Sequence, residues 1–570
     1  LQRINARFNA DFKLSNNMTM AMNIGFARLE RKLLDDGMSK YTSPAWMAQI
    51  KSPFLSPYSF TAEGSKTENF AYTDEFNVGS PLGLIYGSLN NYKNYRFNIN
   101  IAPSYKITPE LTLSTQFDYN LYKTIEGHFR PMYYTPVQYL DEYNGNSYNQ
   151  IQSQVMRNTG FFDETRLTYD KKFNALNTFK AVYGFRFLSN FFESDYVTEH
   201  NSGSNNNTFV TGGNDYLSVD GVNNLSKSIS NYLDVDYDYD NRYFLNAVVS
   251  MDASSRFGRM TESGIHLLGA SWGLFPSING AWLVSSEKFM KNVKPVNFLK
   301  LRAGYSVTGN DGIRDYESMA YFQSVRFYDR ANGLVLSNLE NTKIQWETTG
   351  RANIGIDLSV LKEILSLSFD YYSAKTTNLL TLRDLPEITG LGKYWSNGGE
   401  MTNNGFEFSA NLKALNLKNF KWELGATAGH YVNTVTALPG NESYITQIYD
   451  GEVITKVGQS AAVFYGYKTD GVFSTQADAD AANLKIVTPK GTDMYFAAGD
   501  VKFVDVNNDG IINDDDKQVI GNPNPDFYGN ISSKWTMGSV SLSALCTYSY
   551  GNDVYNYYRS QLANAQDLVN

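Results

Sequence analysis

An alternation of apolar and polar residues, repeated along the chain in stretches of about ten, constrains this sequence more than any other feature. The apolar members of the first stretch are Ile4, Ala6, Phe8, Ala10, Phe12 and Leu14. Successive side chains of a strand point to opposite faces, so each stretch predicts a strand with one apolar and one polar face. Strands of roughly ten residues, joined alternately by tight turns and long loops, are typical of barrels that cross an outer membrane.

Sixteen strands are predicted, in eight hairpins with Asn, Asp, Gly or Pro at the tight turns. They are 3–15 with 18–29, 95–105 with 111–123, 161–170 with 178–188, 230–239 with 242–252, 268–284 with 297–307, 346–358 with 364–373, 405–415 with 421–432, and 527–537 with 540–550. The connector 285–297 has room for a short helix. The connections between hairpins are long: 30–94, 124–160, 189–229, 253–267, 308–345, 374–404 and 433–526. We therefore expect periplasmic turns and extracellular loops.

Composition fits a barrel better than a bundle of membrane helices. The chain has 41 Tyr and 35 Phe but is only 42% hydrophobic, and a membrane helix needs about 20 apolar residues. The longest uncharged candidate, Leu267–Val284, has its apolar residues mainly at even positions. We interpret it as a strand with an irregularity at Pro276.

The polar face of the strands is strongly charged in places. Leu233, Val235, Tyr237 and Tyr239 alternate with Asp234, Asp236, Asp238 and Asp240. A row of carboxylates is costly against lipid, so this face is predicted to line a wet lumen. The alternative, a set of soluble β-domains with decorated loops, does not explain why short and long connections alternate through eight hairpins.

Several function classes have little support. The net charge of −9 argues against a nucleic-acid partner. Cys546 is the single cysteine, which excludes an intramolecular disulfide. The four histidines, His128, His200, His266 and His430, have no metal-binding spacing. No nucleophile–base motif or phosphate-binding glycine loop is found, so we do not expect an enzyme.

Two acidic pairs and four loop aromatics are further candidate sites. Glu30/Asp35 and Asp163/Glu164 are interpreted as surface acid clusters in preference to glycosidase carboxylates, because nothing positions them. Aromatic rings in loops could stack on sugars or contact peptides, but membrane-belt and loop-packing roles are favoured for each of them. These residues are Tyr133, Tyr134, Trp395 and Tyr465.

One segment has the spacing of a calcium loop. Oxygen ligands at positions 1, 3, 5, 9 and 12, a carbonyl at 7 and a glycine at 6 form the calcium-loop template. The candidate metal ligands are Asp505, Asn507, Asp509, Ile511 (carbonyl), Asn513 and Asp516, with Gly510 at the turn. The last ligand is Asp where Glu is usual. The alternative is an acidic turn held by its own hydrogen bonds.

A series of segments resembles the SusC/RagA family of TonB-linked transporters, in the family's order. They are Met251–Gly258 (MDASSRFG), Phe275–Ser277, Ala281–Trp282, Glu287–Met290, Leu299–Asn310 (LKLRAGYSVTGN), Ile344–Thr348, Asn353–Asp357 (NIGID), Asp370–Tyr372, Thr376–Leu380, Asn403–Glu407, Phe464–Gly471 and Gly499–Gly521, followed by Pro523, Pro525 and Tyr528-Gly529. The sequence departs from the family at Ala253, usually Gly, and at Ser250, often Arg. Residues 1–230 match by strand pattern only.

The resemblance implies an all-β fold: a transmembrane antiparallel barrel of 22 strands with an N-terminal plug. With about 16 strands here, three before and three after would complete it, so residues 1–570 are expected to be a partial barrel domain without plug or closing strands. The segment 433–526 would be a long extracellular loop containing the motif at 505–516.

The resemblance also implies partners and a function. These are the TonB–ExbB–ExbD energy-transducing complex, a SusD-like surface lipoprotein and outer-membrane lipid. The expected function is import of a large nutrient, an oligosaccharide or glycan fragment or else a peptide. Two alternatives stay open: a passive porin or structural barrel, and a secreted calcium-dependent carbohydrate-binding or carbohydrate-degrading β-protein.

Overall fold

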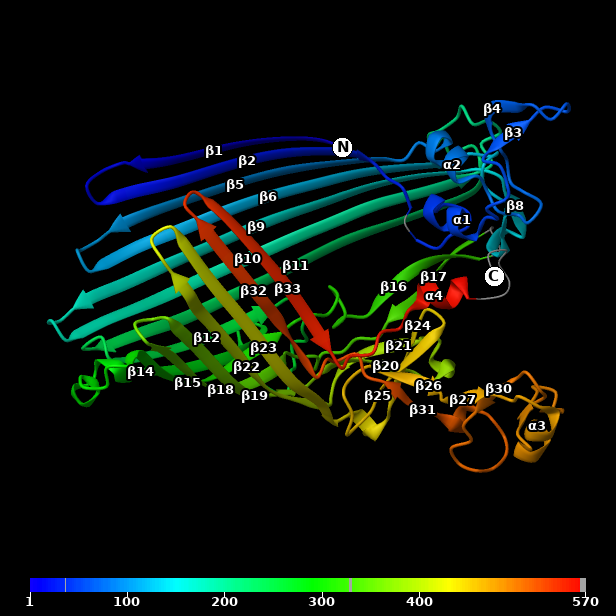
Figure 1. Cartoon of the computed structure of the whole chain (residues 1–570). Coiled ribbons are helices and arrows are strands. Elements are labelled where there is room, and N and C mark those ends of the chain that lie inside the picture. The colour runs from blue at the N-terminus through cyan, green and yellow to red at the C-terminus, as the bar shows by residue number, and fades with distance from the viewer. Residues whose placement is uncertain (36, 328–330, 564–570) are drawn as a thin grey trace.

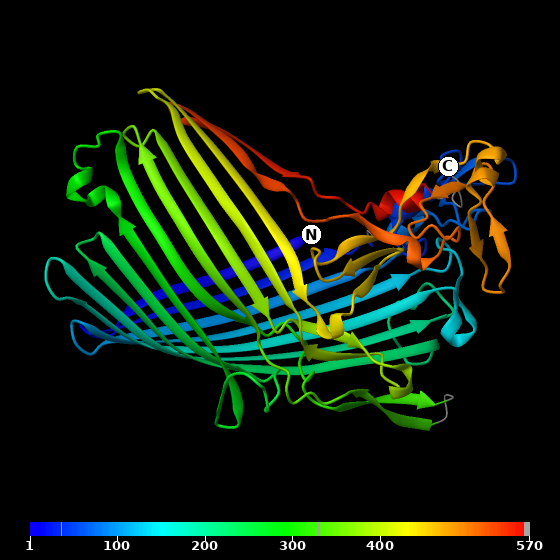
Figure 2. The same ribbon diagram turned by 90° about the horizontal axis from the view of Figure 1, so that it is seen from below.

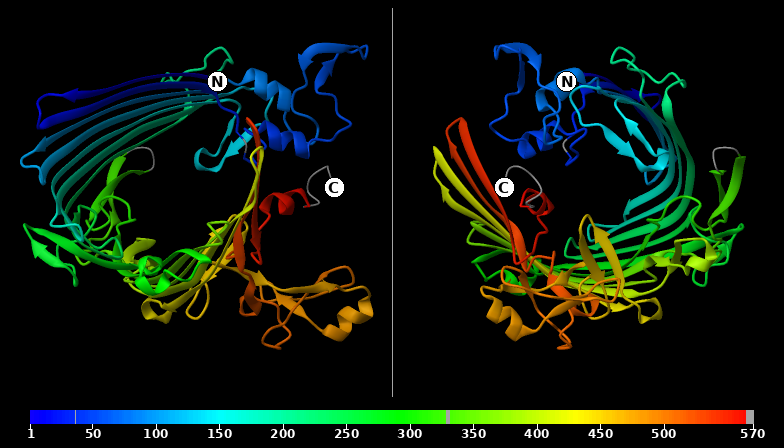
Figure 3. Two further views of the ribbon diagram at one scale, coloured as in Figure 1. Left: turned by 60° about the vertical axis from the view of Figure 1, so that its left-hand side comes forward. Right: turned by 90° about the vertical axis from the view of Figure 1, so that its right-hand side faces the viewer.

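The computed structural model describes residues 1–35, 37–327 and 331–563. Its main element is a 17-stranded sheet, in which each long strand pairs antiparallel with the long strands before and after it in the chain. The sheet curls around an open interior, with β1 and β33 at its two edges (Figure 3). The three-residue strand β13 (Ile265–Leu267) adds to the end of the sheet, and sixteen longer strands form the wall.

The sixteen wall strands confirm the predicted number and order. They are β1 (Gln2–Lys13), β2 (Met18–Lys32), β5 (Asn91–Lys106), β6 (Leu111–Arg130), β9 (Gln150–Lys172), β10 (Asn177–His200), β11 (Asp215–Tyr239), β12 (Tyr243–Ser254), β14 (Ala270–Leu283), β15 (Val296–Asn310), β18 (Glu347–Val360), β19 (Leu365–Thr377), β22 (Glu400–Asn416), β23 (Phe420–Ala437), β32 (Phe527–Met537) and β33 (Val540–Tyr550). The short turns gather at one end of the wall and the long connections at the other (Figures 1 and 2).

Each wall strand has the two faces that the sequence predicts. On β19, Phe369 and Tyr371 are exposed on the outer face, while the Ser368 hydroxyl and the Asp370 carboxylate bond to polar groups of neighbouring strands. Exposed aliphatic and aromatic side chains recur on the outer face of the other strands. An outward apolar band around a polar interior is the arrangement of a barrel in lipid. Among the described residues, no helix has the length and apolarity needed to cross a membrane.

Four strands are far longer than predicted. β9, β10 and β11 have 23, 24 and 25 residues, and β6 continues to Arg130. The added residues lie at the loop end, as in Asp215–Ile229 of β11. Beyond the membrane neither face of a strand meets lipid, so strand pairing can continue without apolar alternation. The strands predicted from the alternation are therefore too short at this end.

The turn end agrees with the predicted chemistry. Asp240 and Asn241 both have positive φ, at 56° and 50°, as a tight hairpin turn requires. The connector after β14 holds two 3₁₀ turns, η2 (Val284–Ser286) and η3 (Lys288–Met290), in place of the short helix. Pro276 lies within β14, and pairing of β14 with β15 begins only at the next residue, Ser277, because proline has no N–H to donate.

The first long connection folds into a small cap at the loop end of the wall. It contains α1 (Pro44–Ile50), α2 (Pro81–Gly87) and the hairpin of β3 (Tyr58–Phe60) and β4 (Lys66–Phe70). Each helix begins with a serine N-cap followed by proline, a strong helix start. The cap has its own buried cluster, made of Trp46, Met47, Ile50, Val78 and Leu84.

The connection after β23 is a folded subdomain rather than an open loop. A four-stranded sheet is formed by β24 (Tyr444–Ile448), β25 (Gly451–Thr455), β26 (Val463–Tyr467) and β31 (Lys517–Gly521). Two small pairs lie beside it, β27 (Thr469–Val472) with β30 (Val501–Phe503) and β28 (Lys485–Val487) with β29 (Asp493–Tyr495), together with α3 (Gln476–Ala482), η5 (Pro439–Asn441) and η6 (Asp514–Asp516). Phe473, Ala479, Leu484 and Ile512 form its buried cluster.

The other loops carry hairpins. The first pairs β7 (Gln138–Leu140) with β8 (Gly145–Ser147), and η1 (Asp141–Tyr143) lies between the two strands. The second pairs β16 (Tyr321–Phe327) with β17 (Ala331–Asn338). The third pairs β20 (Leu380–Asp384) with β21 (Lys393–Asn397), and η4 (Glu387–Thr389) lies between them. The helix α4 (Tyr557–Leu562) follows β33 and lies near the cap, where Tyr558 contacts Trp46 of α1 edge to face at 5.3 Å.

Candidate functional site

The luminal face of the wall carries an ionic cluster centred on Arg302 of β15. Its Nε donates to Oδ2 of Asp357 at 2.8 Å, and its Nη1 donates to Oδ1 of Asp370 at 2.8 Å. Nη2 bonds to both carboxylates, at 3.0 Å and 2.9 Å. Two bidentate pairs fix the plane of one guanidinium, which makes this part of the wall rigid.

A glycine makes this cluster possible. Arg302 lies opposite Gly355, and Gly355 lies opposite Asp370, so the guanidinium crosses the whole of β18 to reach β19. A Cβ at Gly355 would meet the carboxylate of Asp370 and lie 2.8 Å from Cζ of Arg302. The glycine of the NIGID segment is therefore required for the close approach of side chains over the strand.

Further polar groups extend the cluster along the lumen. The Ser368 hydroxyl donates to Asp357 at 2.7 Å, and the Asn353 amide donates to Asp370 at 3.3 Å. Glu407 of β22 lies directly opposite Asp370 in the register. A polar pocket of about 410 Å³ opens here, lined by Asn279, Gly304, Ser306, Arg351, Asn353, Asp370 and Glu407. Four of the family-like segments thus meet at one place on the lumen wall.

Asp163 and Glu164 do not form the surface acid cluster that the sequence predicts, because Glu164 belongs to a second luminal cluster. Glu164 is buried and accepts from Arg186 at 2.8 Å and from the hydroxyl of Tyr232 at 2.9 Å. Asp163 lies on the opposite, outer face, opposite Phe117 and Phe187. The two carboxylates are divided between the faces of β9 and form no catalytic pair.

The segment Met251–Gly258 ties loops together at the loop end of the wall. Nε of Arg256 donates to Asp315 at 2.8 Å, and the Ser254 hydroxyl donates to Asp311 at 2.9 Å. A Cβ at Gly258 would meet the carbonyl oxygen of Thr342. Phe257, Ile313 and Ile344 are buried beside Trp346 and Trp395. This segment therefore has a structural role in holding three loops on the barrel.

The candidate calcium ligands come together in a single turn within the subdomain after β23. Asp505 accepts from N–H of Gly510 at 2.8 Å, Asn507 from N–H of Asp509 at 3.1 Å, and Asp509 from N–H of Ile511 at 2.7 Å. Asn513 accepts from N–H of Asp515 at 2.7 Å. The loop is anchored by Ile512, whose N–H bonds to the carbonyl of Lys485 at 2.8 Å.

Asp516 closes the loop from within. It is fully buried, and its two oxygens accept from N–H of Val506 at 2.8 Å and of Asn513 at 2.9 Å. In the described part of the chain, no group of three or more His, Cys, Asp or Glu side chains is gathered as a metal site. The loop is thus ordered by its own hydrogen bonds, while each carboxylate oxygen has a further lone pair that a hard cation could use.

The loop aromatics and the first acidic pair have packing or local roles. Tyr134 lies against Gly83 and Gly87 of α2, Tyr133 contacts Tyr72 at 5.6 Å, and Trp395 packs beside the cluster around Ile344. Tyr465 pairs with Glu452 in the subdomain sheet. Glu30 bonds to Arg28 at 2.5 Å, whereas Asp35 bonds to Thr42 and lines a pocket.

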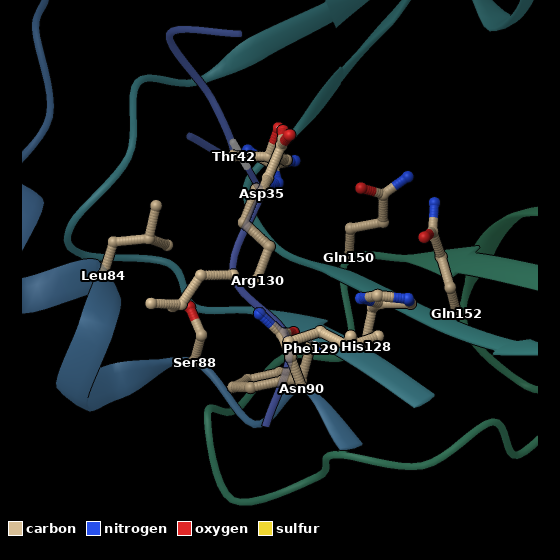
Figure 4. A pocket seen from close by; sticks show the side chains of 12 residues that line it. Asp35, Thr42, Leu84, Ser88, Asn90, His128, Phe129, Arg130, Gln150 and Gln152 are labelled. Carbon is tan, nitrogen blue, oxygen red and sulfur yellow. Dashed lines mark hydrogen bonds between the residues drawn. The ribbon is translucent and has the colours of Figure 1, made fainter. Parts of the chain in front are cut away.

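That pocket, of about 460 Å³, lies where the wall meets the cap (Figure 4). His128 and Arg130 come from the end of β6, and the residues opposite them in the register, Gln152 and Gln150, come from β9. These side chains share a face with Asp118 and Asn120, so they look into the lumen. The remaining lining residues are Leu33, Leu34, Asp35, Thr42, Leu84, Ser88, Asn90 and Phe129.

A buried polar network lies next to the pocket, beyond the apolar band. Arg130 is 4% exposed, and its Nη2 donates to the Ser147 hydroxyl at 2.6 Å. The same hydroxyl bonds to Nδ1 of His200 at 2.7 Å. Burial, together with the charge of Arg130, lowers the pKa of His200 to about 4, and burial lowers the pKa of Arg130 to about 10. His200 is therefore neutral at physiological pH.

Sequence reasoning did not identify this pocket. Gln150, Gln152 and Gln154 alternate with Ile151, Ser153 and Val155, a signal that β9 begins well before the predicted residue 161. On the side of the cap, the pocket is lined by residues such as Leu84 and Ser88, which precede β9 by more than sixty positions. No local sequence pattern connects these residues to β9.

A curved antiparallel wall with an apolar exterior and a charged interior defines an outer-membrane β-barrel. Residues 51–567 match the family described as TonB dependent receptor-like, beta-barrel. The chain belongs to this family, and the SusC/RagA resemblance of its sequence agrees with a SusC protein being among its relatives.

The chain is similar to named TonB-dependent receptors. It is 30% identical over 528 residues to TonB-dependent receptor P39 of Formosa agariphila, covering 85% of this chain and 48% of the relative. It is 27% identical to TonB-dependent receptor SusC of Bacteroides thetaiotaomicron, over 58% of this chain and 32% of the relative. The chain thus spans about half, or less, of these relatives' length.

A solved structure shows the same fold. The structure of the RagAB peptide transporter superposes with a TM-score of 0.76 at 18% identity, over 96% of this chain and 58% of that chain. At this identity the match shows the fold alone.

Proposed function

We propose that this barrel is part of a TonB-dependent importer that carries a large nutrient across the outer membrane. The observation that carries the proposal is the wide interior of the wall (Figure 3), which is lined by charged side chains such as Arg302 and Asp370, in a chain of the TonB-dependent receptor family. A barrel of this width is too large to be filled by its own side chains, so closing it requires a separate body of protein that an energised partner can displace. The TonB–ExbB–ExbD complex is the proposed partner.

The cargo we propose is an oligosaccharide or glycan fragment. SusC is one of the chain's relatives, and the luminal wall offers many hydroxyl, amide and carboxylate groups for a hydroxyl-rich ligand. A peptide is the second candidate, because a structural neighbour is described as a peptide transporter. A SusD-like lipoprotein is proposed to cover the loop end, where the cap and the subdomain after β23 project beyond the wall (Figure 1).

Calcium remains a proposal for the turn at 505–516. Six candidate ligands lie within one ordered turn at the loop end, and the segment is fixed to the subdomain core through Ile512. A bound cation would relieve repulsion among Asp505, Asp509 and Asp516 and stiffen the surface offered to the lipoprotein.

Growth on defined carbon sources tests the import proposal. A strain lacking the full-length gene should fail to grow on one class of polysaccharide and grow normally on its monosaccharides. Complementation by the full-length gene should restore growth. Normal growth of the deletion strain on all oligosaccharides, with failure on peptides alone, would replace the glycan assignment with the peptide one.

A further inference from the structure

The pocket between the wall and the cap has unused hydrogen-bonding groups. Within the described part of the chain, the side chains of Ser88, Gln150 and Gln152 form no hydrogen bond, and all three are half-buried. Each glutamine amide has two donors and an acceptor with two lone pairs. Leaving such groups unpaired in a partly enclosed space is unfavourable unless water or a ligand satisfies them.

The pocket also borders a buried cation without a carboxylate partner. Arg130 lines it, and no Asp or Glu of the described residues forms an ion pair with this guanidinium. Its Nη1 and Nη2 bond to neutral oxygens of Thr135, Pro136 and Ser147, and its Nε is buried without a partner. A buried arginine is normally paired with an anion.

Among the described residues of the lining, the one carboxylate, Asp35, is engaged elsewhere. Asp35 is exposed and accepts from N–H of Gly37 at 2.8 Å and from the Thr42 hydroxyl at 2.5 Å. Rows of luminal carboxylates lie on β11, β18, β19 and β22, and the carboxylate of β6 beside the pocket, Glu126, lies 3.7 Å from His128. An anion that enters the pocket therefore meets an arginine that no carboxylate of the described residues neutralises.

We propose that this pocket binds an acidic sugar unit of the imported ligand, with the sugar hydroxyls on Gln150, Gln152 and Ser88 and the anionic group on the side of Arg130. The assignment rests on the proposed function and names its substrate more narrowly: saccharides carrying a carboxylate or sulfate. The volume of about 460 Å³ lies within the usual range for ligand pockets. Planar amides suit adjacent hydroxyls, and a guanidinium suits a planar anion.

A saccharide fits better than a peptide because the pocket offers no free strand edge. β5 is paired with β2 and β6, and β6 is paired with β5 and β9. Extended peptides are usually captured through main-chain hydrogen bonds to an unpaired edge.

Binding to the purified full-length protein tests the proposal. The probes are an oligogalacturonate, a sulfated oligosaccharide and a neutral oligosaccharide of equal length, measured by calorimetry. We expect one of the acidic ligands to bind at least about tenfold more tightly than the neutral one. Gln150→Ala combined with Gln152→Ala should weaken acidic-ligand binding about tenfold.

Two further variants sharpen the result. Gln154→Ala is the matched control, because Gln154 shares the strand and face but bonds to Ser194 at 3.1 Å and does not line the pocket; its binding should equal that of the wild type. Arg130→Gln should reduce the preference for acidic over neutral ligand. If this variant fails to fold, the glutamine variants still decide the question.

Two outcomes would overturn the assignment. One is equal affinity for acidic and neutral ligands in the wild type. The other is unchanged acidic-ligand binding after both glutamines are replaced. If neutral oligosaccharides are still imported in either case, the import function stands and only the pocket assignment fails. Absence of energy-dependent uptake of any saccharide would instead overturn the proposed function.

Discussion

Arg302 on β15 and Asp370 on β19 are joined across an intervening strand, with Nη1 to Oδ1 at 2.8 Å and Nη2 to Oδ2 at 2.9 Å. Gly355 on β18 lies between them in the register. The pair therefore links three strands of the wall by side chains, in addition to the backbone ladders. Because it also holds Asp357, loss of the arginine leaves two neighbouring carboxylates without their cation.

Replacing Gly355 by Ala should break this link. The new Cβ would meet Asp370 and displace the guanidinium, with an expected loss of about 1–3 kcal/mol, since the charged hydrogen bonds are partly screened by water. Unfolding of the refolded full-length protein in urea, followed by gel mobility, measures the loss. Gly280→Ala is the matched control, because its added Cβ would have 3.9 Å to the nearest atom. Equal stability of the two variants would contradict a close-approach role for Gly355.

The two faces of β19 should differ in their tolerance of charge. Arg at Leu367, on the lipid side, should cost roughly 2–4 kcal/mol if the position lies near mid-depth. Arg at the adjacent Ser368 should cost less, because it enters the polar lumen beside Asp357 and Asp370. A folding assay of the full-length protein in lipid vesicles compares the two. Equal costs would count against the assignment of faces.

Stability of the loop-end network should depend on pH through His200. Its pKa is about 4 in the folded protein and about 6.5 when unfolded. The unfolded state therefore binds more protons between these values, and the His200 contribution to stability falls as pH drops from 6.5 toward 4. Hydrogen exchange at the loop end of β10 should accelerate over this window. His200→Gln, which cannot titrate, should flatten the dependence, and an unchanged profile would exclude His200 as its source.

Calcium binding by the turn at 505–516 is tested by calorimetry on the full-length protein. The combined change Asp505→Ala and Asp509→Ala should abolish calcium heat and weaken lipoprotein docking without affecting barrel assembly. Asp515→Ala is the matched control, since it lies in the same turn but outside the ligand positions. If the wild type gives no heat at millimolar calcium and its affinity for the lipoprotein is unchanged in chelator, residues 505–516 are an acidic turn that binds no calcium.

The wall could be predicted from the sequence because lipid imposes a strict alternation on it. Leu365–Tyr371 shows apolar residues at every second position, and the structure confirms both its strand and its faces. Asp215–Ile229 shows no such alternation, since it extends beyond the lipid, and its strand was missed. The turn at 505–516 needs only a local segment, and the structure shows it as a hydrogen-bonded turn; calcium binding there stays a prediction.

The luminal clusters and the pocket could not be predicted, because they depend on register and loop packing. Nothing in the sequence places Arg302 opposite Gly355, a pairing set by the register of β15 and β18. Gln150 and Ser88 meet only because the cap folds back onto the wall. A local pattern identified Glu164 as acidic but not its burial beside Arg186 and Tyr232.

Uptake of a fluorescent oligosaccharide, chosen from the growth experiment, tests the central claim most directly. Cells with the full-length gene are compared before and after collapse of the proton-motive force, and with and without TonB. An energy-dependent importer should accumulate the probe in the periplasm only in energised cells that have TonB. Equal uptake in all four conditions would identify a passive porin and contradict the account.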